Sequence, residues 1–292
     1  MVSEPARVDV CVLGSANLDV VTRVARLPRP GETLLGTSYA EYPGGKGLNQ
    51  AVAAARSGAA TAFVGALGDD DAATMLRSVL AADGIDARCV ETAGAPTGRA
   101  VIFVDDDGEN VIVVVPGANA VVGATAELPR ANVLLAQLEV PLDAVIAGCR
   151  RARSTGSTVV VNPAPAADLP DALLEQVDVL VPNAHEVELL GGAPALLARG
   201  IVTVLVTRGK DGVDVHHRGE QWTQPAFTVD VVDTTGAGDA FCGALAARLA
   251  TGAAMTDAVR WAAAAGALAT TVAGAVPAQP TADAIRTLLG VR

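Results

Sequence analysis

Hydrophobic positions along this chain fall into short β-type runs that alternate with helical runs. The alternation is most regular after residue 132, where strands are predicted at 133–136, 158–161, 177–181 and 202–207 and helices at 142–153 and 186–190. Strands that alternate with helical segments indicate a parallel sheet with helices on both faces. The pattern therefore predicts an α/β fold, a three-layer α/β/α sandwich around a mostly parallel central sheet.

The N-terminal half carries similar elements and, between them, β runs that lack helices of their own. We expect a buried strand at 8–14, helices at 46–56 and 72–82, and strands at 34–42, 62–65, 99–105 and 110–115. The turn at 106–109 between the last two strands predicts that they form a β-hairpin. We interpret residues 1–292 as one domain, in which segments 15–44 and 97–116 form a small inserted β-sheet, a lid that covers a site.

The composition narrows the partners of this domain. The 292 residues carry a formal charge of −11, and 51% of them are hydrophobic while 18% are charged. Excess negative charge disfavours nucleic acid and anionic membranes as partners, and an aromatic content of 3% offers few platforms for base stacking. Small molecules, rather than nucleic acid or a membrane, are therefore the expected partners.

Cysteine usage and the apolar segments favour a cytoplasmic location. Cys11, Cys89, Cys149 and Cys242 lie far apart and form no CxxC pair, which is typical of buried thiols in a reducing compartment. The first residues lack a basic region followed by an apolar core, so no signal peptide is expected. The apolar segment 261–276 consists mostly of Ala, Gly and Thr and predicts a buried helix, not a membrane span.

Polar clusters follow several of the predicted strands. They lie at 14–19, 137–139, 162–163, 183–186 and 207–212. Any one of them could be turn chemistry, but ligands of open α/β sheets bind beyond the carboxyl ends of the strands. The position that the clusters share therefore predicts a ligand site along that edge of the sheet.

The most informative stretch is the glycine-containing segment that ends at Asp239. It follows a β-type run at 227–232 and opens a helical run at 240–250. The small residues at 236–238 let backbone N–H groups converge at a helix N-terminus, where an anion such as a transferring phosphoryl group is stabilised. A carboxylate beside that anion repels it unless the carboxylate takes a proton from an incoming hydroxyl. The alternative is a Gly-rich N-cap whose acid complements the helix dipole.

Other polar residues suit a polyol and a metal ion. Asn17, Asp19 and Asn49 offer the mixture of acceptors and amides that neighbouring hydroxyls require. Glu186 is a candidate to hold Mg²⁺ through water, since this ion keeps part of its hydration shell. The simpler alternatives are a turn residue for Asp19, a first-turn helix acid for Glu186 and a solvated loop acid for Glu139.

Seven segments, in one order, give the chain a resemblance to a known family. They are 14–19 (Gly-Ser-Ala-Asn-Leu-Asp), 30–33 (Pro-Gly-Glu-Thr), 44–51 (Gly-Gly-Lys-Gly-Leu-Asn-Gln-Ala), 117–119 (Gly-Ala-Asn), 162–166 (Asn-Pro-Ala-Pro-Ala), 182–186 (Pro-Asn-Ala-His-Glu) and 233–239 (Asp-Thr-Thr-Gly-Ala-Gly-Asp). Over nearly its whole length the chain resembles the ribokinase-like (phosphofructokinase-B type) carbohydrate kinases. Segments 44–51 and 162–166 are more similar to the ribokinases than to other sugar kinases.

The resemblance implies ATP-dependent phosphorylation of the primary hydroxyl of D-ribose, which gives D-ribose 5-phosphate. Asp239 would be the catalytic base, and the amides of Gly236, Ala237 and Gly238 would form the anion hole. The sugar would be held by Asn17, Asp19, Gly45, Lys46, Asn49, Glu139 and Asp239. The nucleotide and its Mg²⁺ would lie against Asn183, Glu186, Thr207, Gly209, Gly212 and Gly238.

The resemblance also implies a monovalent cation, K⁺, beside the anion hole and a homodimer formed through the lid. The cation would be bound by the carboxylate of Asp233 and the carbonyl groups of Thr235, Ala269, Val272 and Gly274. The chain departs from the family at three places. Ala278 stands where a hydroxyl residue is common, Ala263 stands where Asn or His often lies beside the adenine, and 191–194 replaces a longer helix.

Two alternatives to a ribose kinase stay open. A kinase of the same family for another sugar or a nucleoside would use the same sugar contacts, with Ala100 and Ile102 of the lid making room for a base. A non-catalytic sugar- or nucleotide-binding protein on the same fold would not need the carboxylate of Asp239. Turnover measured over a panel of sugars and nucleosides separates these three possibilities.

Overall fold

The computed structural model describes residues 7–291, and its centre is a nine-stranded sheet. The strand order is β13-β12-β11-β10-β9-β8-β1-β4-β5, parallel throughout except for the antiparallel pairs made by β12. The strands are β1 (Val8–Leu13), β4 (Thr61–Leu67), β5 (Val90–Thr92), β8 (Ala131–Ala136), β9 (Thr158–Val161), β10 (Val179–Leu180), β11 (Thr203–Thr207), β12 (Val213–His217) and β13 (Glu220–Gln224). The predicted mostly parallel sheet is confirmed.

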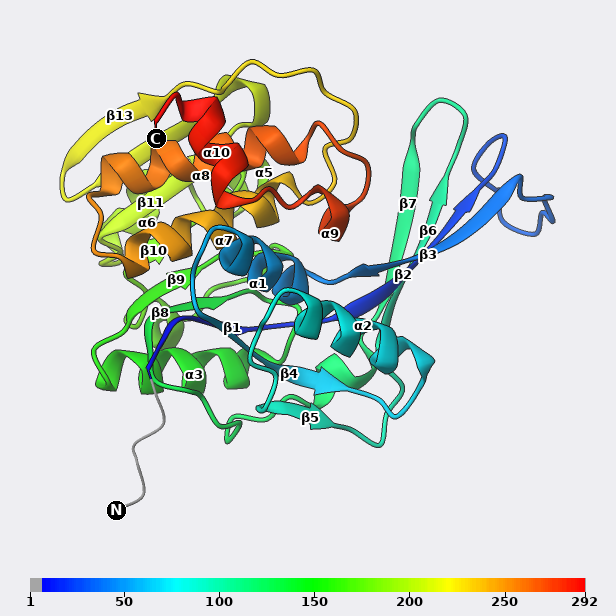
Figure 1. Cartoon of the computed structure of the whole chain (residues 1–292), viewed down its shortest axis with the longest axis horizontal. Helices are drawn as coiled ribbons and strands as arrows, with labels where there is room; N and C mark the ends of the chain where they lie inside the picture. The colour runs from blue at the N-terminus through cyan, green and yellow to red at the C-terminus, as the bar shows by residue number, and fades with distance from the viewer. Residues whose placement is uncertain (1–6, 292) are drawn as a thin grey trace.

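Helices cover both faces of this sheet, which makes three layers (Figure 1). On one face pack α1 (Lys46–Arg56), α2 (Asp71–Ala82), α7 (Ala237–Ala250) and α8 (Met255–Ala269). On the other pack α3 (Leu142–Ser154), α4 (Asp171–Leu174), α5 (Ala184–Leu189) and α6 (Ala193–Ala198). Strand residues alternate between the two cores, as the side-chain period of two requires: Val10 and Val12 belong to the first, and Cys11 and Leu13 to the second.

The chain closes with two short helices, α9 (Ala275–Ala278) and α10 (Ala282–Leu289). Within residues 7–291, no helix is both long enough and apolar enough to span a bilayer. The four cysteines, Cys11, Cys89, Cys149 and Cys242, are free thiols.

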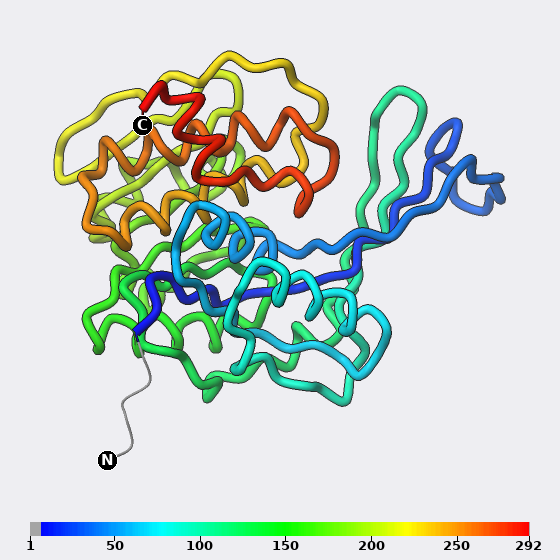
Figure 2. Tube along the Cα trace, in the orientation of Figure 1, coloured from blue at the N-terminus to red at the C-terminus, as the bar shows by residue number. Residues whose placement is uncertain are grey.

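A second sheet of four strands stands apart from the first and projects from one side of the molecule (Figure 2). Its order is β3-β2-β6-β7, formed by β3 (Ser38–Gly44), β2 (Asn17–Arg23), β6 (Gly98–Val104) and β7 (Asn110–Val115). We call it the lid sheet. It comes from the two segments in which a small inserted sheet was predicted. Along β7 the residues Val111, Ile112, Val113, Val114 and Val115 are each between 46% and 54% exposed.

Four predicted elements differ from the structure. The strand predicted at 34–42 is instead β3, Ser38–Gly44. The β-type run at 227–232 is not a strand, because it lies beyond the edge strand β13 and pairs with no neighbouring strand; instead, the N–H of Val232 donates to the carbonyl oxygen of Thr270. The helix predicted to reach residue 276 ends at Ala269, since a turn follows and Gly274 has a positive φ of 86°. Strand β10 has only two residues, Val179–Leu180.

Candidate active site

The first turn of α7 presents open backbone beyond the carboxyl ends of the strands. Its N-cap, Gly236, has a φ of 75°, a left-handed conformation that glycine adopts at little cost. N–H groups in a first turn lack intrahelical acceptors and carry the positive end of the helix dipole. The N–H of Ala237 makes only a long hydrogen bond, 3.3 Å, to the carbonyl oxygen of Thr234. A Cβ placed at Gly238 would meet nothing within 4 Å, so an anion can approach this turn.

Asp239 lies in the same turn and is held by two amide side chains of α1. Its carboxylate oxygens accept hydrogen bonds of 2.9 Å from Nδ2 of Asn49 and 2.9 Å from Nε2 of Gln50. Burial raises the pKa of Asp239, and the charge of Glu139 adds to the rise, while Lys46 and the two amides oppose it. A carboxylate with a fixed orientation and a raised pKa is suited to accept a proton from a hydroxyl.

A chain of amides fixes Gln50 in turn. Its Nε2 also donates to Oδ1 of Asn162 at 3.2 Å, and its Oε1 accepts a 2.6 Å hydrogen bond from Gln137. Asn162 donates to the carbonyl oxygen of Val181 at 2.9 Å. Since residues 162 and 181 follow β9 and β10, this network ties Asp239 to the carboxyl ends of the central sheet.

Asn49 keeps one polar atom without a partner. Its Nδ2 is used by Asp239, but its Oδ1 is buried and accepts no hydrogen bond from any residue in the described range 7–291. An unsatisfied buried acceptor costs about 1–3 kcal/mol. A ligand hydroxyl that donated to Oδ1 would recover part of that free energy beside the carboxylate of Asp239, which is the arrangement that a polyol requires.

The N-terminus of α1 packs closely against residues 14–16, which connect β1 and β2. Gly45 has a φ of 89°, and a Cβ there would lie 2.8 Å from the Cα of Ala16, so only glycine fits. The N–H of Lys46 donates to Oε2 of Glu139 at 3.0 Å, and the same oxygen accepts a 2.5 Å hydrogen bond from the hydroxyl of Ser15. Glu139 is therefore bound to the first turn of α1 and is not a solvated loop acid.

Asn17 and Asp19 lie on β2 of the lid sheet and reach the same region. Oδ1 of Asn17 accepts a 2.7 Å hydrogen bond from Asn119. Burial raises the pKa of Asp19 to about 7, with further contributions from the charges of Glu139 and Asp239. Asn17 pairs with Gly44 across β2 and β3, and Gly44 directly precedes the start of α1, so strand pairing brings this end of β2 to the residues of α1 that were predicted to hold a sugar.

Lys46 is the cation among these acids. Burial alone would lower its pKa, but the carboxylates of Asp239, Glu139 and Glu186 outweigh that effect and the pKa is raised. The lysine therefore stays protonated and offsets only part of the surrounding negative charge. A phosphate that enters this region would be repelled unless a further cation accompanied it.

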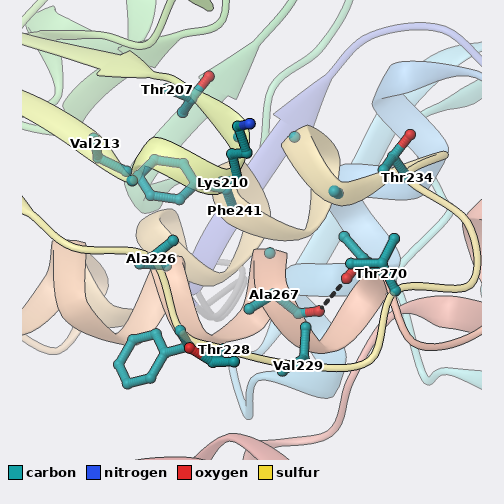
Figure 3. Close-up of a pocket in the computed structure, with 18 residues that line it drawn as sticks. Thr207, Lys210, Val213, Ala226, Thr228, Val229, Thr234, Phe241, Ala267 and Thr270 are labelled. Carbon is teal, nitrogen blue, oxygen red and sulfur yellow. Dashed lines mark hydrogen bonds between the residues drawn. The ribbon is translucent and has the colours of Figure 1, made fainter.

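Two cavities meet at the start of α7. The smaller has a volume of about 130 Å³ and is lined by Lys46, Asn162, Ala164, Val181, Asn183, Glu186, Thr207, Gly236, Gly238, Asp239 and Cys242. The larger has a volume of about 560 Å³, within the range of ligand pockets, and Thr207, Gly209 and Gly212 are among its lining residues (Figure 3). Thr207 and Gly238 line both cavities. A long ligand in the larger cavity can therefore extend its end toward Asp239.

Asn183 and Glu186 form a capping box at the start of α5. Oδ1 of Asn183 accepts from the N–H of Glu186 at 2.8 Å, and Oε2 of Glu186 accepts from the N–H of Asn183 at 2.8 Å. Oε2 of Glu186 thus has the role of a first-turn helix acid, which was the simpler interpretation of this residue. The other oxygen, Oε1, makes no hydrogen bond within residues 7–291, and burial raises the pKa of this carboxyl although the Asn183 N–H opposes the rise.

Asp233 joins two loops beside the first turn of α7. Its Oδ1 accepts from the N–H and the hydroxyl of Thr235 at 2.9 and 2.7 Å, and its Oδ2 accepts from the N–H of Gly274 at 2.8 Å. Partial burial would raise the pKa of Asp233, but these donors outweigh it and the pKa is lowered. An ionised carboxylate therefore lies where the two loops meet.

The remaining residues named in connection with a cation differ in their exposure. Ala269 and Ala278 pack against Ala240 in a small buried cluster, and Val272 is 44% exposed. Gln279, next to Ala278, is buried; its Nε2 donates to the carbonyl oxygen of Ala275 at 3.0 Å. Its Oε1 has no partner within the described residues, so a buried oxygen is available close to α7.

Comparison with known proteins identifies the family to which this site belongs. Residues 7–282 match the family described as pfkB family carbohydrate kinase. The chain is a member of this family. It is 38% identical over 294 residues to the ribokinase of Haemophilus influenzae, a match that covers 94% of this chain and 96% of that relative.

Solved structures of this pfkB family match the fold closely. The ribokinase of Thermotoga maritima has a TM-score of 0.92 at 33% identity, over 97% of this chain and 99% of that one. The ribokinase of Arabidopsis thaliana, solved with ribose and ATP, has a TM-score of 0.90 at 31% identity, over 98% of this chain and 100% of that one. The predicted ribokinase-like fold, with its small inserted β-sheet, is confirmed.

Sequence reasoning missed several residues that build this pfkB-family site. Gln50 and Asn162 lay in the segments that carry the resemblance but were given no role, and Gln137 was noted only as part of a polar cluster. Lys210 lies in the cluster at 207–212 and lines the larger cavity. The available signal was burial of polar side chains: Gln50 and Gln137 are both 0% exposed, which a sequence does not display.

Proposed function

We propose that this protein transfers the γ-phosphoryl group of ATP to the primary hydroxyl of D-ribose and so produces D-ribose 5-phosphate. The observation that carries the proposal is the position of Asp239. Its buried carboxylate borders the smaller cavity beside Gly238, where the larger cavity joins. The side chain of Asn49 orients this carboxylate and also carries an unpartnered oxygen, Oδ1. The similarity to ribokinases over nearly the whole chain supports the choice of ribose.

In the proposed reaction Asp239 accepts the proton of the ribose 5-hydroxyl as that oxygen bonds to the γ-phosphorus. The bond from the γ-phosphorus to the bridging oxygen of ADP breaks in the same step. The N–H groups of Gly236, Ala237 and Gly238 stabilise the negative charge on the transferring group. Asn49 and Gln50 keep the carboxylate of Asp239 in one orientation, and orientation of this kind is the main contribution of a protein to phosphoryl transfer.

The sugar would lie between the lid sheet and the N-terminus of α1. We assign its hydroxyls to Asn17, Asp19, Gly45, Lys46, Asn49 and Glu139. Two carboxylates in this set, Asp19 and Glu139, are acceptors for hydroxyl donors, whereas Lys46 and the amide of Asn49 supply the complementary chemistry. The raised pKa of Asp19 indicates that its charge is poorly compensated without a ligand, and donors on a sugar would favour the ionised form.

A divalent cation, Mg²⁺, fits the smaller cavity because phosphate would otherwise meet two carboxylates there. Glu186 and Asp239 both line it, and no group of three His, Cys, Asp or Glu within residues 7–291 forms a cage for a metal ion. Mg²⁺ commonly keeps several waters and binds to one or two carboxylates and to substrate phosphates. Glu186, through its free Oε1, and Asn183 would hold it, and the ion would neutralise phosphate charge.

A monovalent cation, K⁺, fits the loops that Asp233 joins, since the donors there are hard oxygens. They are the ionised carboxylate of Asp233 and the backbone carbonyls of Thr235, Ala269, Val272 and Gly274. Ala278 offers no hydroxyl, whereas the buried Oε1 of Gln279 is unpartnered nearby. Such an ion would add positive charge close to the anion hole.

We further propose that residues 1–292 act as one domain whose lid sheet closes over the sugar and joins two copies into a homodimer. The valine-rich strand β7 supports this, because a row of half-exposed apolar residues is costly in a lone molecule. Light scattering would report about twice the 29.3 kDa chain mass. A monomer mass at micromolar concentration would contradict the dimer.

The function is tested by direct detection of sugar phosphate with purified protein. We expect ADP release that requires both D-ribose and Mg²⁺ and that rises when KCl replaces NaCl at constant ionic strength. The panel should include 2-deoxyribose, other sugars and adenosine. A much higher kcat/KM for another acceptor would overturn the ribose assignment but not the kinase, whereas ribose binding without turnover under every condition would favour a non-catalytic protein.

A further inference from the structure

The wall of the larger cavity has few side chains that can form hydrogen bonds. Of its 18 lining residues, the ones that can do so are Thr207, Lys210, Thr228, Thr234 and Thr270 (Figure 3). None of the 18 is Asn, Gln, Asp, Glu or His. The smaller cavity contrasts with this, since Asn, Asp, Glu and Lys side chains line it. A ligand in the larger cavity therefore meets mainly small and apolar groups.

The larger cavity joins the smaller one at one end, and the phosphate groups of a nucleotide would lie at that end. Thr207 and Gly238 line both cavities, and Thr234 and Ala237 adjoin Gly238 at the start of α7. Lys210 lies on a short 3₁₀ turn, η2 (Gly209–Asp211), that comes after Thr207. Among the lining side chains, only that of Lys210 donates hydrogen bonds without accepting any. Because η2 begins two residues after Thr207, Lys210 lies close in sequence to the junction of the cavities and can attract phosphate.

The opposite wall is formed by α8 and by the extended segment 226–231. The α8 residues on the wall are Ala263, Gly266, Ala267 and Thr270. Their spacing of three, four and seven residues puts them on one face of the helix, and all four are small. Figure 3 shows Val229 of the extended segment beside Ala267, with Thr228 and Ala226 farther along the same segment. The two sides leave a slot with apolar walls, which suits the flat face of a base.

Discrimination between adenine and guanine depends on their opposite hydrogen-bonding groups at position 6, an amino donor in adenine and an oxo acceptor in guanine. A side chain that only accepts or only donates can tell them apart. A threonine hydroxyl does both, and the hydroxyl of Thr270 already donates to the carbonyl oxygen of Ala267 at 2.7 Å. The side chains of this wall therefore contain no group that matches one base and opposes the other.

We propose that the larger cavity holds a purine by packing rather than by side-chain hydrogen bonds, so that GTP serves as a phosphoryl donor as well as ATP. This inference rests on the proposed kinase function. Apolar pockets separate related ligands by only about 10–200-fold, whereas sites built on buried polar contacts reach about 10⁴–10⁵. The kcat/KM for GTP is therefore expected within about 100-fold of that for ATP.

The test measures ribose phosphate directly, with MgATP and with MgGTP at saturating ribose, and the binding of ADP and GDP by calorimetry. Comparable turnover and binding of both nucleotides would support the inference. A preference for ATP above about 100-fold, with weak GDP binding, would overturn it and would mean that backbone groups read the base. Turnover with neither nucleotide would instead refute the proposed function.

Two variants sharpen the result. Ala263→Asp places a carboxylate, which only accepts hydrogen bonds, on the cavity face of α8, and we expect it to change the ATP-to-GTP ratio by at least tenfold. Thr256→Asp adds the same carboxylate at an exposed position near the start of α8 and should leave the ratio unchanged. If Ala263→Asp folds and binds ADP with an unchanged ratio, the base does not pack on this face. If it does not fold, the parent ratio still decides.

Discussion

Around the smaller cavity, polar side chains form hydrogen bonds with one another. The larger cavity beside it is lined mainly by small apolar residues. Asp239 is fixed by Asn49 and Gln50, and Gln50 by Gln137 and Asn162. In the larger cavity the hydroxyl of Thr270 is used within its own helix. Both cavities share the open space at Gly238.

The difference indicates which part of the reaction the protein specifies closely. Removing one member of a buried polar network leaves its neighbours unsatisfied, so such networks keep a single arrangement. A wall of Ala, Gly and Val permits several ligands of similar shape. We infer that the reacting hydroxyl and phosphoryl groups are positioned strictly and that the nucleotide base is not.

The largest expected effect comes from Asp239→Asn, which keeps the shape of the side chain but removes the base. We expect kcat to fall by ~10²–10⁴ while ribose and ADP still bind. One amide of Asn49 or Gln50 would then face another donor, so the variant should also lose some stability. Steady-state kinetics and calorimetry measure these effects.

The matched control for that variant is Asp257→Asn. Asp257 also lies in the first turn of a helix, α8, but is exposed. Activity should be unchanged there. Near-normal turnover in Asp239→Asn would refute the role of this residue as base, and a fall of similar size in both variants would mean that a helix-end charge, rather than proton transfer, is responsible.

A smaller effect is expected from Gly238→Ala, which tests the junction of the two cavities. The added methyl would occupy the open space in which we place the transferring phosphoryl group, so kcat/KM for ATP should fall at least tenfold. Stability should not fall, because alanine in a helix is favoured over glycine by about 0.5–1 kcal/mol. Kinetics and thermal melting together separate the two effects.

Gly123→Ala is the control for the junction. A Cβ at Gly123 would make only an ordinary contact of 3.7 Å with the hydroxyl of Thr125, and this residue lines neither cavity. Both activity and melting temperature should stay near those of the parent. Unchanged turnover in Gly238→Ala would show that the phosphoryl group does not pass this point.

The layered fold could be predicted from sequence because its strands have strong, regular patterns. Thr158–Val161 and Lys46–Arg56 were predicted at their observed bounds. The prediction of a β-type run at 227–232 was wrong because β-type residues alone do not show whether a neighbouring strand is available for pairing. The end of α8 was missed because Thr270 and Thr271 are compatible with a helix, while here their hydroxyls bind the last turn.

The site was predictable only in part. Polar residues after strands indicated a ligand edge, and the structure does bring Asn49, Lys46, Glu139 and Asp239 together there. The roles of Gln50 and Gln137 depend on burial and on contacts between residues far apart in the chain, 87 positions in the case of their mutual hydrogen bond. No local pattern carries that information.

The smallest effect concerns Asp19, on the polar side of the comparison. Burial raises its pKa in the folded protein from 3.8 to about 7. Between these pH values the folded protein retains a proton that the unfolded chain has lost, so stability falls as the pH rises through this window. Asp19→Asn has no charge to bury. Its melting temperature relative to the parent should therefore rise from pH 4 to about pH 7 and then level off. Asp106→Asn, at an exposed turn of the lid sheet, is the control for removal of a carboxylate from the surface. A flat profile for Asp19→Asn would mean that this carboxylate is already compensated without a sugar.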